Sequence, residues 1–123
     1  MKLFVPGMTA ILVVVAALAS SDASAVVTQG RTYVFYNGTQ VIGQSLMYCN
    51  NAEKHWGEAS QHNLANAVSV SYSCSDGFAI HVGYPANIDP WVKTNFCSQT
   101  QSCDTGPWPV AGAPALENLL WSD

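Results

Sequence analysis

Basic side chains are scarce in this sequence. Its 123 residues include four Lys and Arg against eight Asp and Glu, so the formal net charge is −4, and charged residues make up only 10% of the chain. Proteins that bind the phosphates of nucleic acid or an anionic membrane surface need clustered positive charge. We therefore expect no nucleic-acid partner and, once the N-terminal segment described below is removed, no membrane partner.

The sequence patterns of common catalytic and metal sites are also missing. No serine stands in the Gly-x-Ser-x-Gly pattern of a nucleophile elbow. The three histidines, His55, His62 and His81, lack the His-x-x-x-His spacing that binds zinc on a helix, so only the fold could assemble them with Glu58 into a site. We expect surface histidines, no metal and no cofactor.

Carboxylate pairs are a weaker signal, because the two acids of a glycoside hydrolase come from distant parts of a chain. Glu53 with Glu58 and Asp89 with Asp104 are the candidates here. A domain of this size has little room for a cleft that excludes water. We expect no catalytic residues, although a small glycan-acting hydrolase stays open as an alternative.

Long apolar runs are absent after the N-terminus. Lys2 precedes an almost wholly apolar stretch from Leu3 to Ala19, and Ala23-Ser24-Ala25 has the small-x-small pattern of a cleavage site. We predict a signal peptide over residues 1–25, cleaved after Ala25. Residues 26–123 then form a single domain, secreted or periplasmic, and we expect a monomer.

Four cysteines remain in this exported domain, and they match no zinc-ligand pattern. Outside the reducing cytosol, cysteines pair as disulfides, which would make the domain disulfide-stabilised. Four cysteines allow three pairings, and sequence cannot choose among them with certainty. We favour Cys97–Cys103, because five polar residues separate them, and this leaves Cys49–Cys74.

The clearest structural signal is a β-hairpin over residues 67–84. Its first arm alternates Val68, Val70 and Tyr72 with serines, and its second arm places Phe78, Ile80, Val82 and Tyr84 on one face. Such alternation predicts strands with one dry and one wet face. Asp76-Gly77 lies between the arms and is a strong hairpin-turn signal.

Residues 31–60 predict the other strands. Residues 31–36 are β-forming and apolar on both faces, and Asn37-Gly38 predicts a tight turn into a strand over 39–49 with a bulge or bend at Gly43. A short third strand is expected over 55–60. The fold class is thus small and mainly β: an antiparallel meander of four or five strands with two hairpins.

Beyond residue 88 the pattern changes to helix and loop. Asp89-Pro90 is a helix-start signal, so we predict one or two helical turns that place Trp91 and Phe96 in the core. Residues 104–114 are rich in Pro and Gly and must be irregular. Residues 115–121 predict a short terminal helix.

A resemblance rests on four motifs: Tyr33-Val34-Phe35-Tyr36-Asn37-Gly38, Val41-Ile42-Gly43, Tyr48-Cys49 and Trp56-Gly57. On these, residues 33–60 resemble a family of short exported bacterial proteins, an uncharacterised domain of unknown function. The resemblance implies a small exported β-structure and a bacterial source. It implies no activity.

Tryptophan and serine supply the candidate binding residues. Trp108 lies between two prolines and is the best candidate for an exposed anchor, but the interpretation in which it folds back to cap the sheet is slightly preferred. Trp56 and Trp91 are assigned to the core. The other candidate binding residues are the polar strand face of the central hairpin: Ser69, Ser71, Ser73 and His81.

Two functions from different classes follow. The first is an exported binding or inhibitory module that acts on a protein partner outside the cytosol. The alternative is a carbohydrate- or cell-wall-binding module, or a small glycan-acting hydrolase, because aromatic rings beside Asn and Gln also stack on sugars. The partner would be a protein in the first case and a glycan in the second.

Overall fold

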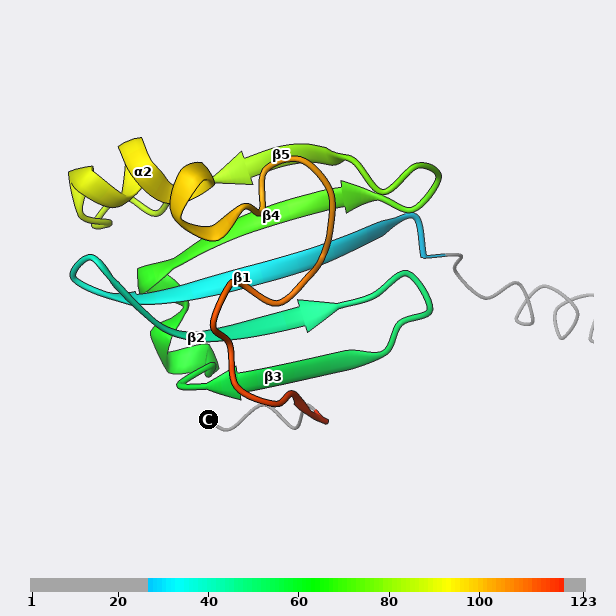
Figure 1. Ribbon diagram of the computed structural model, residues 1–123, viewed down its shortest axis with the longest axis horizontal. Coiled ribbons are helices and arrows are strands. Elements are labelled where there is room, and N and C mark those ends of the chain that lie inside the picture. The colour runs from blue at the N-terminus through cyan, green and yellow to red at the C-terminus, as the bar shows by residue number, and fades with distance from the viewer. Residues whose placement is uncertain (1–26, 119–123) are drawn as a thin grey trace, which may run out of the picture.

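The computed structural model describes residues 27–118 and has one antiparallel sheet (Figure 1). The predicted signal peptide and cleavage site lie outside the described residues. The strands run in the order β5-β4-β1-β2-β3-β6, with a 3₁₀ helix η1 before β4 and an α-helix α2 after β5. Their bounds are β1 Gln29–Asn37, β2 Gln40–Met47, β3 Glu53–Gly57, η1 Gln61–Asn66, β4 Ala67–Ser73, β5 Ala79–Gly83, α2 Pro90–Thr100 and β6 Glu117–Asn118.

The predicted fold class is confirmed: a small, mainly-β fold with antiparallel strands, two hairpins and short helical elements. The sheet has six strands where four or five were expected, and its order differs from the expected meander, because β4 pairs with β1 rather than with β3. Strand β1 is therefore central. Its sequence explains why: Val34 and Phe35 point to opposite faces and both are fully buried.

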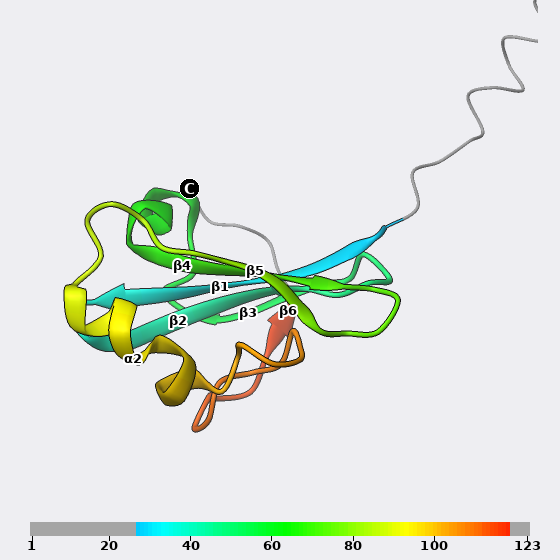
Figure 2. The same ribbon diagram turned by 90° about the horizontal axis from the view of Figure 1, so that it is seen from above.

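The sheet has two different faces. Val34 pairs with Gln44 and Val68, and this face is covered by α2 and the chain that follows it; we call it the α2 face. Tyr33 pairs with Ser45 and Ser69 on the other face, the Tyr33 face. Figure 2 shows α2 on one side of the sheet and η1, the green turn before β4, on the other.

The main core lies between the sheet and α2. Phe96 and Val92 of α2 are fully buried against sheet residues, and the Phe96 ring meets Tyr84 edge-on with centroids 6.0 Å apart. The helix begins where predicted, since the Asp89 carboxylate accepts a 2.8 Å hydrogen bond from the Trp91 amide. It is longer than predicted, at 11 residues. Among the described residues no helix is long and apolar enough to span a membrane.

The prediction that Trp91 is core was wrong. Its side chain is 46% exposed, whereas Val92 beside it is fully buried. Only one face of a helix on a sheet can turn inward. Val92, Phe96 and Thr100 at four-residue spacing take that face, which turns Trp91 outward.

The two predicted hairpins are present, with differences at both turns. The β1–β2 turn is Gly38-Thr39 rather than Asn37-Gly38, since Asn37 pairs with Gln40. Gly38 has a φ of +62°, which suits the first position of a type II′ turn. In the central hairpin Gly77 has the expected positive φ, and Asp76 Oδ1 accepts from the Phe78 amide.

Bulges shift the pairing register of two strands, β2 and β5. Phe35 pairs with Gly43 and Tyr36 with Val41, so the bulge predicted at Gly43 falls on Ile42 beside it. In β5 the extra residue is Ile80.

The β5 bulge overturns part of the predicted apolar face. Phe78 and Ile80 are 57% and 53% exposed, whereas Ala79 and Val82 pack against the main core. Tyr84 also packs there, as predicted. A bulge inserts one residue and so reverses the faces on either side of it.

The third strand and the C-terminal segment also differ from expectation. The third strand is Glu53–Gly57, displaced toward the N-terminus, and Trp56 packs partly buried against the core as predicted. The terminal helix expected over 115–121 is wrong for Glu117–Asn118, which form β6 and pair with Lys54 and His55. Residues 119–121 lie outside the described part of the chain.

Both favoured disulfides are present. Cys49–Cys74 joins the end of β2 to the β4–β5 turn, with the Cα atoms 5.7 Å apart. The bond links the ends of β2 and β4, the two strands that flank β1. Cys74 N also donates to Thr28 O just before β1. Cys97–Cys103 ties α2 to the chain that follows it.

Candidate functional site

Trp108 is exposed, so the slightly preferred interpretation, that it folds back to cap the sheet, was wrong. Its side chain is 56% exposed, and its indole Nε1 donates to Thr105 Oγ1 at 3.3 Å. The preceding Pro107 is buried and lies close to Gly30 of β1, where an added Cβ would be 3.1 Å from the proline ring. The backbone is thus packed onto the sheet while the indole faces solvent.

A buried glutamine holds this segment in place. Gln44 on β2 is fully buried, and its Nε2 donates to Trp108 O at 2.9 Å and to Thr32 Oγ1 at 2.8 Å. Its Oε1 accepts from Val110 N at 3.0 Å and from Trp56 Nε1 at 3.1 Å. Both amide donors and both lone pairs of the acceptor are used.

Gln44 was missed by the sequence reasoning. Gln44 lies in β2 between Gly43 and Ser45, and nothing in this local sequence distinguishes it from other polar residues. Only its pairing with Val34 of the central strand puts it on the α2 face, under the loop that carries Trp108. No local sequence signal identifies it.

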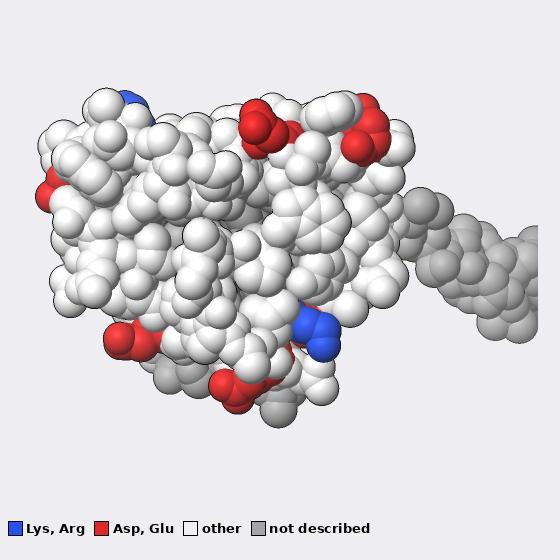
Figure 3. All heavy atoms as spheres, in the orientation of Figure 1, with Lys and Arg blue, Asp and Glu red and all other residues white. Residues whose placement is uncertain are grey.

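A second exposed aromatic residue adjoins this loop. Phe78 forms an isolated bridge with Thr105, the residue that accepts the indole bond, and Ala79 N donates to Asp104 O at 2.8 Å. The tip of the central hairpin is thereby joined to the Trp108 segment. In Figure 3 the charged atoms on this side of the molecule are few and scattered, with no cluster of either sign.

The predicted serine face lies on the opposite side of the sheet. Ser71 pairs with His81 and Ser69 with Gly83, so the structure brings these candidates together on the Tyr33 face. His81 is exposed and the serines are half-buried. Ser73 has a local role, because its Oγ accepts from the Ser75 amide in the turn. Trp108 and the serine face cannot contact one small partner together.

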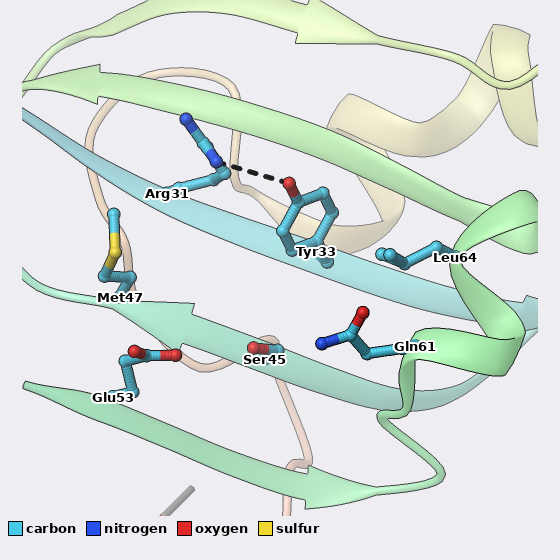
Figure 4. Close-up of a pocket in the computed structure, with 7 residues that line it drawn as sticks. All are labelled: Arg31, Tyr33, Ser45, Met47, Glu53, Gln61 and Leu64. Atoms are coloured by element: carbon cyan, nitrogen blue, oxygen red, sulfur yellow. Dashed lines mark hydrogen bonds between the residues drawn. The ribbon is translucent and has the colours of Figure 1, made fainter. Parts of the chain in front are cut away.

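The Tyr33 face also has a hollow that sequence reasoning did not find. It measures about 270 Å³, and we call it the Tyr33 hollow (Figure 4). Strands β1, β2 and β3 form its floor, and η1 forms one wall. Its lining residues are Arg31, Tyr33, Ser45, Met47, Glu53, Gln61 and Leu64.

Tyr33 stands at the centre of this face. Arg31 Nη1 donates to the Tyr33 hydroxyl at 3.3 Å, and the guanidinium carbon is 5.9 Å from the centroid of the ring. A second hollow of about 360 Å³ adjoins the first and shares Tyr33 and Leu64 with it. Ser69 lines this second hollow. Tyr33 therefore separates two depressions in one surface.

The structure does not gather the histidines and carboxylates into a metal-binding cluster in the part of the chain that it describes. Within residues 27–118, no three His, Cys, Asp or Glu side chains could hold a metal ion together. Asp89 serves as the α2 N-cap. Glu53 and Glu58 line separate hollows. His55 Nδ1 is buried and has no hydrogen-bond partner.

Comparison with known proteins gives no further guide, since no family model, curated protein or solved structure matches this chain.

Proposed function

We propose that this protein is an exported binding module that acts on a protein partner, with Trp108 as its anchor. The observation that carries the proposal is a largely exposed indole on a backbone fixed by the buried Gln44 amide. Exposed large aromatic residues dominate the binding energy of many protein interfaces. Holding the backbone rigid before binding lowers the entropy lost on association.

The surroundings of Trp108 fit a protein partner. Phe78 is exposed and bridges to Thr105, which accepts the Trp108 indole bond, so a second exposed aromatic residue lies on the segment joined to the anchor. Ile80, two residues further along β5, is exposed as well. The few charges on this side suit an interface dominated by apolar contact at its centre.

Export supports the same function. The N-terminal sequence has a signal-peptide pattern, residues 33–60 resemble short exported bacterial proteins, and the two disulfides fit an oxidising compartment. We place the protein in the periplasm or the medium. The intact mass of the purified exported product should correspond to residues 26–123, and a mass that includes residues 1–25 would contradict this.

Trp91 provides a matched control for the anchor, because it is also an exposed tryptophan but lies on α2. The wild-type protein and the Trp108→Ala and Trp91→Ala variants are immobilised and exposed to the exported protein fraction of the source cells. We expect a partner retained by wild type and Trp91→Ala and lost by Trp108→Ala. Thermal unfolding should be similar for all three, because exposed substitutions change stability by about 0.5 kcal/mol or less.

Two results would count against the anchor. One is a partner that Trp108→Ala retains as well as the wild type does. The other is a fall of many degrees in the melting temperature of Trp108→Ala, which would show that the indole is part of the core instead.

A further inference from the structure

We propose that the Tyr33 hollow is a binding site for an uncharged saccharide, on the face of the sheet opposite Trp108. This inference goes beyond the proposed function and does not depend on it. The hollow holds about 270 Å³, close to the lower end of the roughly 300–1,000 Å³ typical of ligand pockets. A ligand of one or two sugar rings matches that size.

The lining groups favour a polyhydroxylated ligand. A sugar hydroxyl both donates and accepts, so its site needs both kinds of partner close together. Arg31 and Gln61 supply N–H donors, whereas Glu53, Ser45 and the Gln61 carbonyl supply acceptors. Arg31 donates to the Tyr33 hydroxyl through Nη1, and a guanidinium has five N–H groups, so the side chain has more donors than this bond uses.

Charge balance favours an uncharged ligand over an anion. Arg31 and Glu53 place one group of each sign at the hollow, so neither sign of ligand gains from the local field. The chain as a whole carries a formal net charge of −4, which disfavours acidic polymers further.

Tyr33 supplies the stacking surface. The apolar C–H face of a sugar ring packs on an aromatic ring, and a held ring loses little entropy when the ligand binds. The Arg31 bond to the Tyr33 hydroxyl holds this side chain, and Figure 4 shows both groups at the hollow beside Leu64 of η1. The second hollow, beyond Tyr33, gives room for an adjoining sugar unit beside Ser69.

The test is a titration of the ¹⁵N-labelled full domain followed by NMR, with chitotriose and cellotriose as uncharged saccharides and a Gly-Ser-Gly peptide as the comparison. Concentrations reach about 10 mM, because small ligands often bind with millimolar dissociation constants. We expect at least one saccharide to shift the amide signals of Arg31, Tyr33 and Gln61 in a saturable way. The peptide should not.

Variants locate the site. Tyr33→Leu keeps an apolar side chain but removes the ring, and it should weaken saccharide binding about tenfold. Gln61→Ala changes an exposed residue of η1, so it tests the hollow even if Tyr33→Leu fails to fold. Trp108→Ala, on the opposite face, should bind saccharide like the wild type.

Three outcomes would overturn the proposal: no shift with either saccharide, shifts with the peptide alone, or shifts centred on the Trp108 loop. Undiminished binding by Gln61→Ala and by a folded Tyr33→Leu would also overturn it. None of these outcomes bears on the protein partner of Trp108, which is measured separately.

Discussion

At the scale of single residues, Gln44 links the core to the candidate anchor. Its amide makes four hydrogen bonds inside the protein, two of them to the backbone of Trp108 and Val110. A buried amide is tolerated only when such bonds are complete. The same side chain therefore stabilises the fold and fixes the backbone that carries the exposed indole.

Replacing Gln44 with Ala should lower the free energy of unfolding by about 2–6 kcal/mol, because the Trp56 indole N–H and the Val110 amide each lose a buried partner at roughly 1–3 kcal/mol. Urea unfolding measures this change. Gln61→Ala is the matched control, since Gln61 is exposed on η1 and should change stability little. Equal midpoints for the two variants would show that the Gln44 bonds contribute nothing net.

Tyr72 should make the stability of the fold depend on pH in the alkaline range. Burial raises the pKa of its hydroxyl from 10.0 to about 12, and burial also raises the pKa of Tyr36. The folded state thus favours the neutral phenol. Its contribution to stability is complete below pH 10 and is lost as the pH rises from 10 through about 12.

The free energy of unfolding of the wild-type protein should therefore fall between pH 10 and 12. For Tyr72→Phe it should fall less steeply over the same range, because Phe does not titrate. Urea unfolding across that range checks it, on samples kept briefly at high pH. Tyr72→Phe also loses the 2.6 Å bond to Ser102 O, so it should be less stable at neutral pH by about 1 kcal/mol. Parallel curves for the two proteins above pH 10 would contradict the assignment to Tyr72.

At the scale of elements, β2 and β3 approach each other closely at two glycines. Gly57 has a φ of +68°, and a Cβ there would clash with Ile42 O; a Cβ on Gly43 would lie 2.6 Å from Glu58 N. Both obstacles are backbone atoms, which cannot move aside. Gly38, by contrast, has open space around it in the β1–β2 turn, although its φ is also positive.

We expect Gly43→Ala and Gly57→Ala to destabilise the protein by more than about 2 kcal/mol, and Gly38→Ala by about 1 kcal/mol, since only the first two add a clash. Thermal or urea unfolding ranks them. A Gly38→Ala variant as unstable as Gly57→Ala would mean that strain alone, and not the strand contact, sets the cost.

At the scale of the whole molecule, the two disulfides constrain loops of different length. Cys49 and Cys74 are 25 residues apart in sequence and Cys97 and Cys103 are 6 apart. In the loop-entropy description they contribute about 3.5 and about 2.4 kcal/mol. Together these are comparable to the whole net stability of a small domain.

Reduction should accordingly unfold the protein or lower its melting temperature strongly, as followed by circular dichroism with and without reductant. The Cys49→Ser/Cys74→Ser pair should lose more stability than Cys97→Ser/Cys103→Ser. An unchanged melting temperature in reductant, with the thiols shown to be free, would contradict a stabilising role for the disulfides.

Local patterns in the sequence were enough for the elements whose signals are local. Three such signals are the alternation of Val68, Val70 and Tyr72, the Asp89 N-cap, and the short separation of Cys97 and Cys103, which are 6 apart in sequence. Each depends only on neighbours in the chain, and each prediction was confirmed. Phe78 and Trp91 were misplaced, because a bulge and the packing of a helix decide their directions.

The sequence by itself determined a small disulfide-bonded β-domain, since hydrophobic alternation, turn chemistry and cysteine spacing act over short stretches of chain. The exposure of Trp108 was decided by the tertiary structure. Tertiary structure alone decided that β1 is central, that Gln44 is the buried support of Trp108 and that Arg31, Tyr33 and Gln61 meet at one hollow. The physical reason is that strand order and the crossover through η1 bring together residues far apart in sequence, and no local signal encodes their proximity.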